Sequence, residues 1–255
     1  MSKIIAIANQ KGGVGKTTSA VNLAAALGAA GKKTLLIDAD PQGNTTSGYG
    51  IDKRSVSLST YQVLLGSASA QEAILETQFQ NVWVMPASMD LAAAELELSE
   101  MDKRATRLRI ALALVKNQYD YILIDCPPSL GLVTINGLCA ADTLLVPIQC
   151  EYYALEGLSQ LMASVRQIKR LYNETLELEG VLLTMYDGRL NLTRQVVNEV
   201  KKFFPGKVFA TAIPRAVRLS EAPGFGMPVL YYDKHSKGAE AYNMVAAEII
   251  ENNQK

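Results

Sequence analysis

Short apolar segments alternate along the chain with longer segments in which apolar positions recur at helical spacing. Several short segments are apolar at every position, as expected of strands that helices cover on both faces. We predict strands over residues 3–8, 33–38, 81–86, 120–125, 143–147, 180–184 and 207–211. We predict helices over residues 17–30, 103–116, 155–172, 192–204 and 239–251.

This alternation predicts the fold class. Strand and helix in turn indicate a doubly wound, mostly parallel α/β sheet with helices on both faces and right-handed crossovers. No repeat period and no low-complexity linker interrupts the pattern, so we expect residues 1–255 to form a single domain.

A glycine-rich loop, NQKGGVGKTT, joins the first predicted strand to the first predicted helix. Its glycines let the backbone bend so that successive N–H groups point at phosphate oxygens, and the helix adds the positive end of its dipole. In such a P-loop, Lys16 reaches the β- and γ-phosphates and the Thr17 hydroxyl binds Mg²⁺. The predicted ATP-binding residues are Lys11, Gly12, Gly13, Val14, Gly15, Lys16, Thr17 and Thr18.

The loop departs from the strict pattern G-x-x-x-x-G-K-[ST], because Gln10 stands where the first glycine belongs and Lys11 adds a second cation. The segment KGGVGKTT resembles the deviant Walker A loop of the ParA/MinD superfamily of P-loop ATPases. The resemblance implies that Lys11 reaches the nucleotide of a second subunit in an ATP-sandwich homodimer.

Acidic residues end two of the predicted strands. Asp125 closes YILID and resembles a Walker B acid, which would hold Mg²⁺ together with Thr17. Asp38 closes LLID, and Asp40 begins the loop DADPQGN, which resembles the superfamily's switch motif. A single aspartate at a strand end often caps a turn, but two of them behind a P-loop favour a functional role.

The resemblance implies that Asp40 positions the attacking water. Lys11, Lys16 and Asp40 are therefore the candidate catalytic residues. The sequence contains no recognisable arginine finger, so we expect slow ATP hydrolysis.

Further segments extend the resemblance over nearly the whole chain, and they look like those of the chromosomal, Soj-type ParA partitioning ATPases. They read DADPQGNTTSG, IDCPPSLG, VPIQCEYYALEGLSQL and IPRAVRLSEAPGFGMPV. The resemblance implies that Pro214 and Arg215 lie near the adenine and residues 149–153 near the dimer interface. It also implies an ATP-bound dimer that binds double-stranded DNA non-specifically, and a centromere-binding partner of the ParB type that stimulates hydrolysis. Such a protein is cytoplasmic and associated with the nucleoid.

Charge is uneven along the chain although its 25 basic and 25 acidic residues balance. Residues 187–237 hold nine basic and four acidic residues, and a patch of this kind binds phosphates without reading sequence. By resemblance, Arg189 and Arg218 are the leading DNA-binding candidates, and Lys201 and Lys202 come next. Residues 68–100 hold six acidic residues and no basic one, which makes them a candidate partner surface.

Three alternatives share the P-loop. A MinD-like positioning ATPase would need a basic amphipathic helix at its C-terminus, whereas this chain ends AYNMVAAEIIENNQK, so we expect no membrane contact. An iron–sulfur reductase would need suitably placed cysteines, but Cys126, Cys139 and Cys150 lie on apolar segments and are expected to be buried thiols. A metabolic ligase or amidotransferase would need its own acid–base groups, and none is legible.

Overall fold

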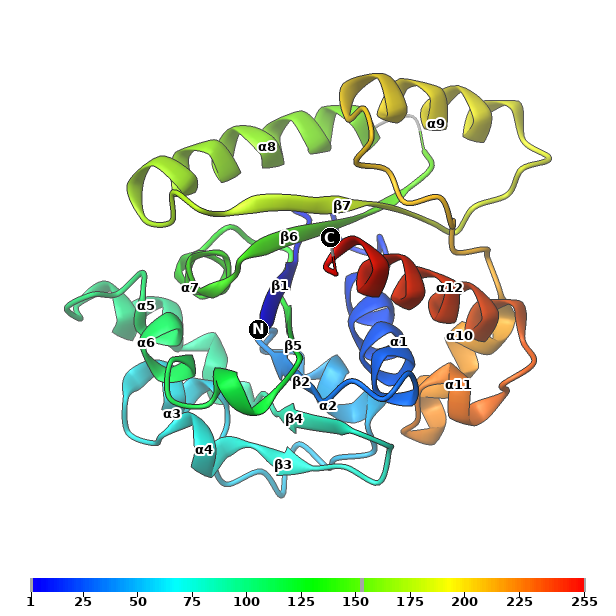
Figure 1. Cartoon of the computed structure of the whole chain (residues 1–255). Coiled ribbons are helices and arrows are strands. Elements are labelled where there is room, and N and C mark those ends of the chain that lie inside the picture. Colours follow the sequence, from blue (N-terminus) through cyan, green and yellow to red (C-terminus); the bar gives the residue numbers. More distant parts are fainter. Residues whose placement is uncertain (1, 152–153, 255) are drawn as a thin grey trace.

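The computed structural model describes residues 2–151 and 154–254, and one seven-stranded sheet organises them (Figure 1). The strand order is β3-β4-β2-β5-β1-β6-β7. Only β3 and β4 pair antiparallel, and the other neighbouring strands run parallel, which confirms the doubly wound, mostly parallel fold. The strands are β1 (Lys3–Ile7), β2 (Thr34–Asp38), β3 (Leu75–Glu76), β4 (Val82–Met85), β5 (Tyr121–Asp125), β6 (Thr143–Gln149) and β7 (Glu177–Thr184).

Helices cover both faces of this sheet (Figure 1). The α-helices are α1 (Lys16–Ala29), α2 (Asn44–Gly48), α3 (Thr60–Leu65), α4 (Ala70–Ala73), α5 (Ala94–Ser99), α6 (Arg107–Leu112), α7 (Leu132–Ala140), α8 (Ala154–Leu171), α9 (Asn191–Phe203), α10 (Val217–Glu221), α11 (Val229–Tyr232) and α12 (Lys237–Asn252). Short 3₁₀ turns are η1 (Met89–Ala92), η2 (Lys116–Gln118) and η3 (Ala222–Phe225).

Alternate residues of β1 show why the strands are apolar at every position. Ile4 and Ala6 pack into one hydrophobic cluster, to which helices α3 to α9 contribute buried residues. Ile5 and Ile7 pack into a second cluster with residues of α1 and α12. Side chains of a strand point alternately to opposite faces, so a sheet covered twice needs apolar residues at both sets of positions.

The predicted strand over residues 207–211 is wrong. Lys207 and Phe209 exchange backbone hydrogen bonds with Val181 of β7, but the next two N–H groups turn to a carboxylate. Glu248 of α12 accepts from Ala210 N at 2.8 Å and from Thr211 N at 2.9 Å. Because these donors are used by a side chain, the pairing ends after an isolated bridge.

The predicted helix over residues 103–116 is shorter than expected. The α-helix α6 spans only Arg107–Leu112. Lys103, at the start of the predicted range, has a positive φ of 54°, which no right-handed helix accommodates. The short helices between β2 and β7, such as α2 and α7, were not predicted, because segments of four to nine residues show little periodicity.

The C-terminal helix α12 packs on α1, beside it in Figure 1. Its buried face includes Tyr242, Val245 and Ile249, and its described charges include Glu240, Glu248 and Glu251. The C-terminal segment therefore docks on the core. None of the described helices is both long enough and apolar enough to cross a membrane.

The strand order also determines where the candidate chemistry meets. β2, β5 and β1 are neighbours at the centre of the sheet, and Asp38 and Asp125 are register partners at the ends of β2 and β5. The loops after these three strands therefore share the carboxyl edge of the sheet, where open α/β sheets bind ligands.

Candidate functional site

The glycine-rich loop connects β1 to α1 and has the backbone geometry of a phosphate cradle. Gly13 and Gly15 adopt left-handed φ values of 72° and 88°, which favour glycine. No described residue lies within 4 Å of a Cβ built on Gly12 or Gly13, so the loop is not packed against the fold at these two positions. The first turn of α1 carries no acidic residue, so its positive dipole end remains available to an anion.

Two lysines of the loop are held differently. Lys16 is buried, and its Nζ donates to the backbone oxygen of Lys11 at 3.1 Å. Burial lowers the pKa of Lys16, and the carboxylates of Asp125 and Asp40 oppose that shift. The Lys11 side chain is half-exposed and forms an ion pair with Glu151 at 2.9 Å. The cation predicted to bind its own nucleotide is thus buried at the site, and the one predicted to act across a dimer lies at the surface.

The two acids at the strand ends are both buried. Asp38 accepts from Thr46 N at 2.8 Å and from the Thr46 hydroxyl at 2.6 Å. Asp125 Oδ2 accepts from the Thr45 hydroxyl at 2.8 Å, while Asp125 Oδ1 is buried without a hydrogen-bond partner among the described residues. Burial raises the pKa of Asp38 to about 6 and that of Asp125 to about 7, because each carboxylate loses hydration and faces other acids.

The unpaired oxygen of Asp125 fits the predicted Mg²⁺ site. A buried carboxylate oxygen without a partner is costly unless a donor or a cation satisfies it. The Thr17 side chain lies close enough to Asp125 to lower its pKa. Thr17 and Asp125 therefore lie near one another at the edge of the sheet, and their shared role in holding Mg²⁺ stays a prediction.

Asp40 lies in the turn that follows β2. Its backbone N–H donates to Asp38 Oδ1 at 3.2 Å, and its own Oδ1 accepts from Gln42 N at 2.9 Å. Its charge acts on Lys16, so the side chain lies near the phosphate loop. Asp40 thus stabilises the turn after β2 and also lies beside the phosphate loop.

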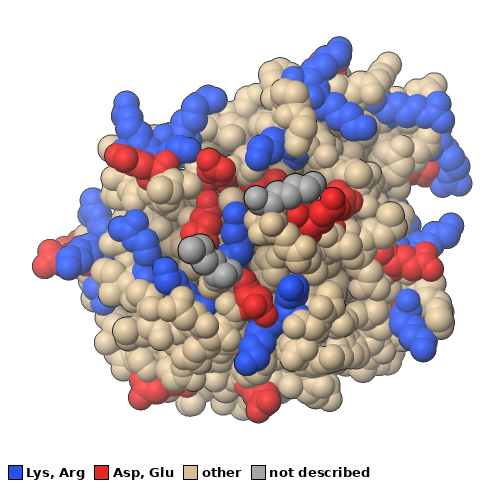
Figure 2. Space-filling view, in the orientation of Figure 1, with Lys and Arg blue, Asp and Glu red and all other residues tan. Residues whose placement is uncertain are grey.

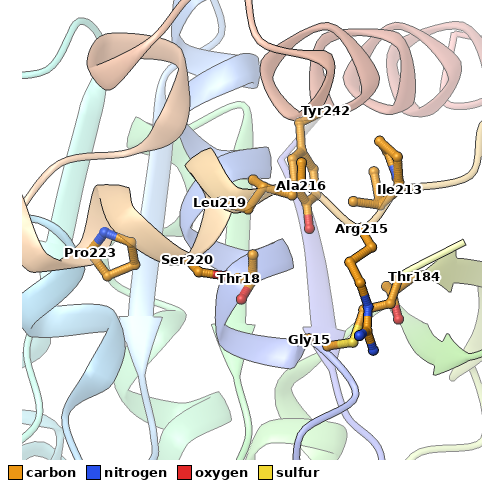
Figure 3. A pocket seen from close by; sticks show the side chains of 12 residues that line it. Gly15, Thr18, Thr184, Ile213, Arg215, Ala216, Leu219, Ser220, Pro223 and Tyr242 are labelled. Atoms are coloured by element: carbon orange, nitrogen blue, oxygen red, sulfur yellow. The ribbon is translucent and has the colours of Figure 1, made fainter.

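A cavity of about 390 Å³ opens next to the phosphate loop (Figure 3). Figure 3 shows the Arg215 side chain extending toward Gly15 and Thr184, and Tyr242 entering from α12. Pro214 and Arg215, the predicted adenine contacts, both line this cavity. The cavity is lined by Gly15, Thr18, Thr184, Met185, Ile213, Pro214, Arg215, Ala216, Leu219, Ser220, Pro223 and Tyr242.

The four candidate DNA-binding residues are all on the C-terminal half, and three carry local ion pairs. Arg189, in the loop before α9, pairs with Asp187 at 2.6 Å, and Lys202, in the last turn of α9, pairs with Glu199 at 2.6 Å. Lys201 is exposed beside it. Figure 2 shows Lys and Arg side chains gathered over the region of α9.

Arg218 lies apart from these residues in the chain, on α10. It pairs with Glu221 at 2.8 Å and with Asp233 at 3.3 Å, and its guanidinium lies 5.8 Å from the centre of the Tyr232 ring. That Arg218 and Arg189 contact one DNA duplex stays a prediction.

Comparison with known proteins identifies the family. A family model described as an AAA domain matches residues 2–178. The sporulation initiation inhibitor protein Soj of Bacillus subtilis (strain 168) is 56% identical over 252 residues, covering 99% of this chain and 100% of that protein. The chromosome partitioning protein ParA of Myxococcus xanthus (strain DK1622) is 51% identical over 250 residues, covering 98% of this chain and 88% of that protein.

The chain belongs to the ParA/MinD superfamily, on its Soj-type branch. A solved structure, the cobyrinic acid a,c-diamide synthase from Mycobacterium smegmatis with bound ADP and magnesium, superposes on this ParA-type chain with a TM-score of 0.89. It is 36% identical and covers 100% of this chain and 96% of its own.

The cysteines of this ParA-type chain are buried and free, as expected. Burial raises the pKa of Cys139 and of Cys150 to about 11, so neither is a ready thiolate ligand. Among the described residues, no group of three or more His, Cys, Asp or Glu side chains is placed to hold a metal ion.

The acidic segment 68–100 is partly engaged inside the ParA-type fold. Glu95 accepts from Leu132 N at 2.6 Å at the start of α7, and Glu72 caps α4. Glu97 accepts from the Tyr61 hydroxyl at 2.7 Å. The predicted dimer-interface segment 149–153 falls partly on residues 152 and 153, which lie outside the described residues.

The sequence pattern missed several residues of the site. Thr45 and Thr46 lie in the segment DADPQGNTTSG, and their hydroxyls donate to Asp125 and Asp38. Two hydroxyl residues shortly after paired acids could have indicated this role. Thr184 and Tyr242 also line the cavity, but the sequence gives no indication of it, because their local patterns are those of any strand or core helix.

Proposed function

We propose that this chain is an ATP-dependent switch for DNA segregation, which hydrolyses ATP slowly and is stimulated by a partner. The observation that supports it most directly is the convergence at one edge of the sheet of the phosphate loop, buried Lys16 and Asp125, whose Oδ1 has no hydrogen-bond partner within residues 2–151 and 154–254. The relatives named Soj and ParA support the step from ATPase to partitioning.

ATP binding follows from the chain's own groups. The loop N–H groups from Lys11 to Thr18 and the start of α1 would hold the phosphates, with Lys16 on the β- and γ-phosphates. Pro214 and Arg215 would line the base in the adjoining cavity. The Thr17 hydroxyl and Asp125 would hold Mg²⁺, which would neutralise charge on the phosphates.

Hydrolysis would depend on positioning. Asp40 would orient a water whose oxygen bonds to the γ-phosphorus as the bond to ADP breaks. Lys16 would stabilise the charge that spreads over the transferred phosphoryl group. We expect hydrolysis to stay slow until a partner completes the site.

Dimerisation would bring Lys11 to the nucleotide of a second copy. To reach it, the lysine must leave Glu151, and both side chains of that ion pair are about half-exposed. An exposed pair of this kind contributes only about 0–1 kcal/mol, so a phosphate can displace it. The resting position of Lys11 is thus compatible with its proposed role in trans.

DNA binding would use Arg189, Arg218, Lys201 and Lys202 in the ATP-bound dimer. Their ion pairs are local and exposed, so phosphates can compete for the same cations. A dimer doubles the number of cations, which gives affinity without sequence readout. The DNA-bound form would associate with the nucleoid in the cytoplasm, and a ParB-type centromere-binding protein would stimulate its release.

A MinD-like membrane role is the weaker alternative. It would need a basic, exposed amphipathic C-terminal helix, whereas α12 is packed on the core and carries Glu240, Glu248 and Glu251.

The test is binding to random-sequence duplex DNA without nucleotide, with ADP and with ATP and Mg²⁺, over a salt series. We expect tight binding with ATP alone, falling steeply as salt rises. Binding that is absent in all three states would refute the proposal, and anionic lipid vesicles added to the same three samples would then test the membrane role.

A further inference from the structure

Thr184 is the last residue of β7 and lines the candidate nucleotide cavity, but its hydroxyl is hydrogen-bonded to the protein backbone. The residue is 2% exposed. Its Oγ1 donates to the backbone oxygen of Val14 at 2.8 Å, joining residues 170 positions apart in the chain. Val14 lies within the phosphate loop, so the edge strand β7 holds the loop through this hydrogen bond.

The methyl group of Thr184 borders the next residue of the loop, on the side where a Cβ would project. A Cβ built on Gly15 would lie 3.5 Å from Thr184 Cγ2. Gly15 has a φ of 88°, so its backbone conformation is one that few other residues adopt without strain. Thr184 therefore lies beside two consecutive residues of the loop: its hydroxyl donates to Val14, and its methyl group occupies the space next to Gly15.

This arrangement fixes the direction of one N–H group. In a planar trans peptide the carbonyl oxygen of one residue and the N–H of the next point in opposite directions. When Thr184 holds the Val14 oxygen, the Gly15 N–H must point away from β7. A phosphate cradle works only when such N–H groups converge on one point.

We propose that Thr184 is a positioning residue for phosphate binding, which acts by fixing the peptide plane between Val14 and Gly15. The inference rests on the proposed nucleotide-binding function and deepens it. Because the hydroxyl holds the loop, its loss weakens ATP, ADP and GTP by the same factor and leaves the choice of base unchanged.

Thr184→Val tests this with little change of shape. We expect the dissociation constants of ATP and ADP with Mg²⁺ to rise about five- to tenfold, the worth of one buried hydrogen bond. The ratio of ATP to GTP affinity stays as in the wild type. Thr184→Ser keeps the hydroxyl and binds within about twofold of the wild type.

Thr34→Val is the matched control. Thr34 is fully buried on β2, and its hydroxyl also donates to a backbone oxygen, that of Lys32, at 3.0 Å. It begins its strand at the end opposite the phosphate loop. We expect both valine variants to lower the unfolding midpoint without nucleotide, and only Thr184→Val to weaken nucleotide binding.

Two results would overturn the inference, and they are distinguishable. If the wild type binds ATP and Thr184→Val binds it within twofold, Thr184 does not position the loop and the proposed function stands. If the wild type binds neither ATP nor ADP, the proposed function fails, and the role of Thr184 fails with it.

Discussion

The nucleotide site and the candidate DNA surface hold their charged groups in opposite ways. Asp125, Asp38 and Lys16 are buried, and Asp125 is held by Thr45, which lies 80 positions away. Arg189 is exposed and pairs with Asp187, two positions away. In the first region the fold holds each charge in place, so single changes have large effects. In the second, each cation is replaceable, and affinity comes from their number.

Lys16→Ala should have the largest effect. It removes the buried cation that faces the phosphates, so we expect affinity for ATP to fall at least about a hundredfold. Titration with a fluorescent ATP analogue measures the change. Lys116→Ala, an exposed lysine on η2, is the control and should bind as the wild type does. Undiminished binding by Lys16→Ala would show that the two regions do not differ as described.

Lys11→Ala separates binding from dimerisation. We expect ATP binding within about threefold of the wild type, because Lys11 points to Glu151, and at least a tenfold weaker ATP-dependent dimer. Sedimentation velocity with ATP and Mg²⁺ measures the dimer. Glu151→Ala breaks the same ion pair but keeps the lysine. An unchanged dimer in Lys11→Ala would count against a contact in trans.

Asp125→Asn tests the buried charge through pH. The pKa of Asp125 is raised to about 7 when folded, above its value of about 4 when unfolded, so the folded state binds the proton more tightly. This stabilisation is complete below about pH 4 and is lost as pH rises through 7. Between pH 5 and 8, the metal-free wild type should lose on the order of 1–3 kcal/mol of unfolding free energy relative to Asp125→Asn. Urea unfolding with a chelator measures it, and a pH-independent difference would contradict the prediction.

Arg189→Ala should have a moderate effect on DNA and none on ATP hydrolysis without DNA. We expect about three- to tenfold weaker DNA binding and a log–log salt slope reduced by about 1. Arg54→Ala is closely matched, because Arg54 is also exposed and also pairs with an acid two positions before it. Equal losses in both variants would mean that Arg189 belongs to no particular DNA surface.

Asp187→Asn should have the smallest effect, in the opposite direction. The Arg189 guanidinium holds the pKa of Asp187 down at about 2, so the acid is charged at any physiological pH. Removing it frees Arg189 for phosphate, and we expect about two- to threefold tighter DNA binding. Asp52→Asn is the control, and weaker binding by Asp187→Asn would show that the acid helps Arg189 on DNA.

The candidate site could be predicted where its signal is local. Short sequence motifs contain the loop glycines, Lys16 and the two strand-end acids. The residue types and spacing within each motif were enough to predict their roles. Pro214 and Arg215 required a resemblance, since nothing in their spacing indicates a cavity beside a loop 200 residues earlier. Thr184 could not be predicted at all, because its function depends on one hydrogen bond to Val14.

The sequence alone determined the layered α/β fold, the phosphate loop and the acids behind it, because apolar periodicity and turn chemistry act between near neighbours. Tertiary structure decided the rest. It ended the pairing of residues 207–211 when Glu248 took the next two N–H donors. It also buried Asp125, one of whose oxygens has no hydrogen-bond partner in the described part of the chain, and placed Lys11 on Glu151. Burial and hydrogen bonding between distant residues depend on which elements pack together, and no local pattern contains that information.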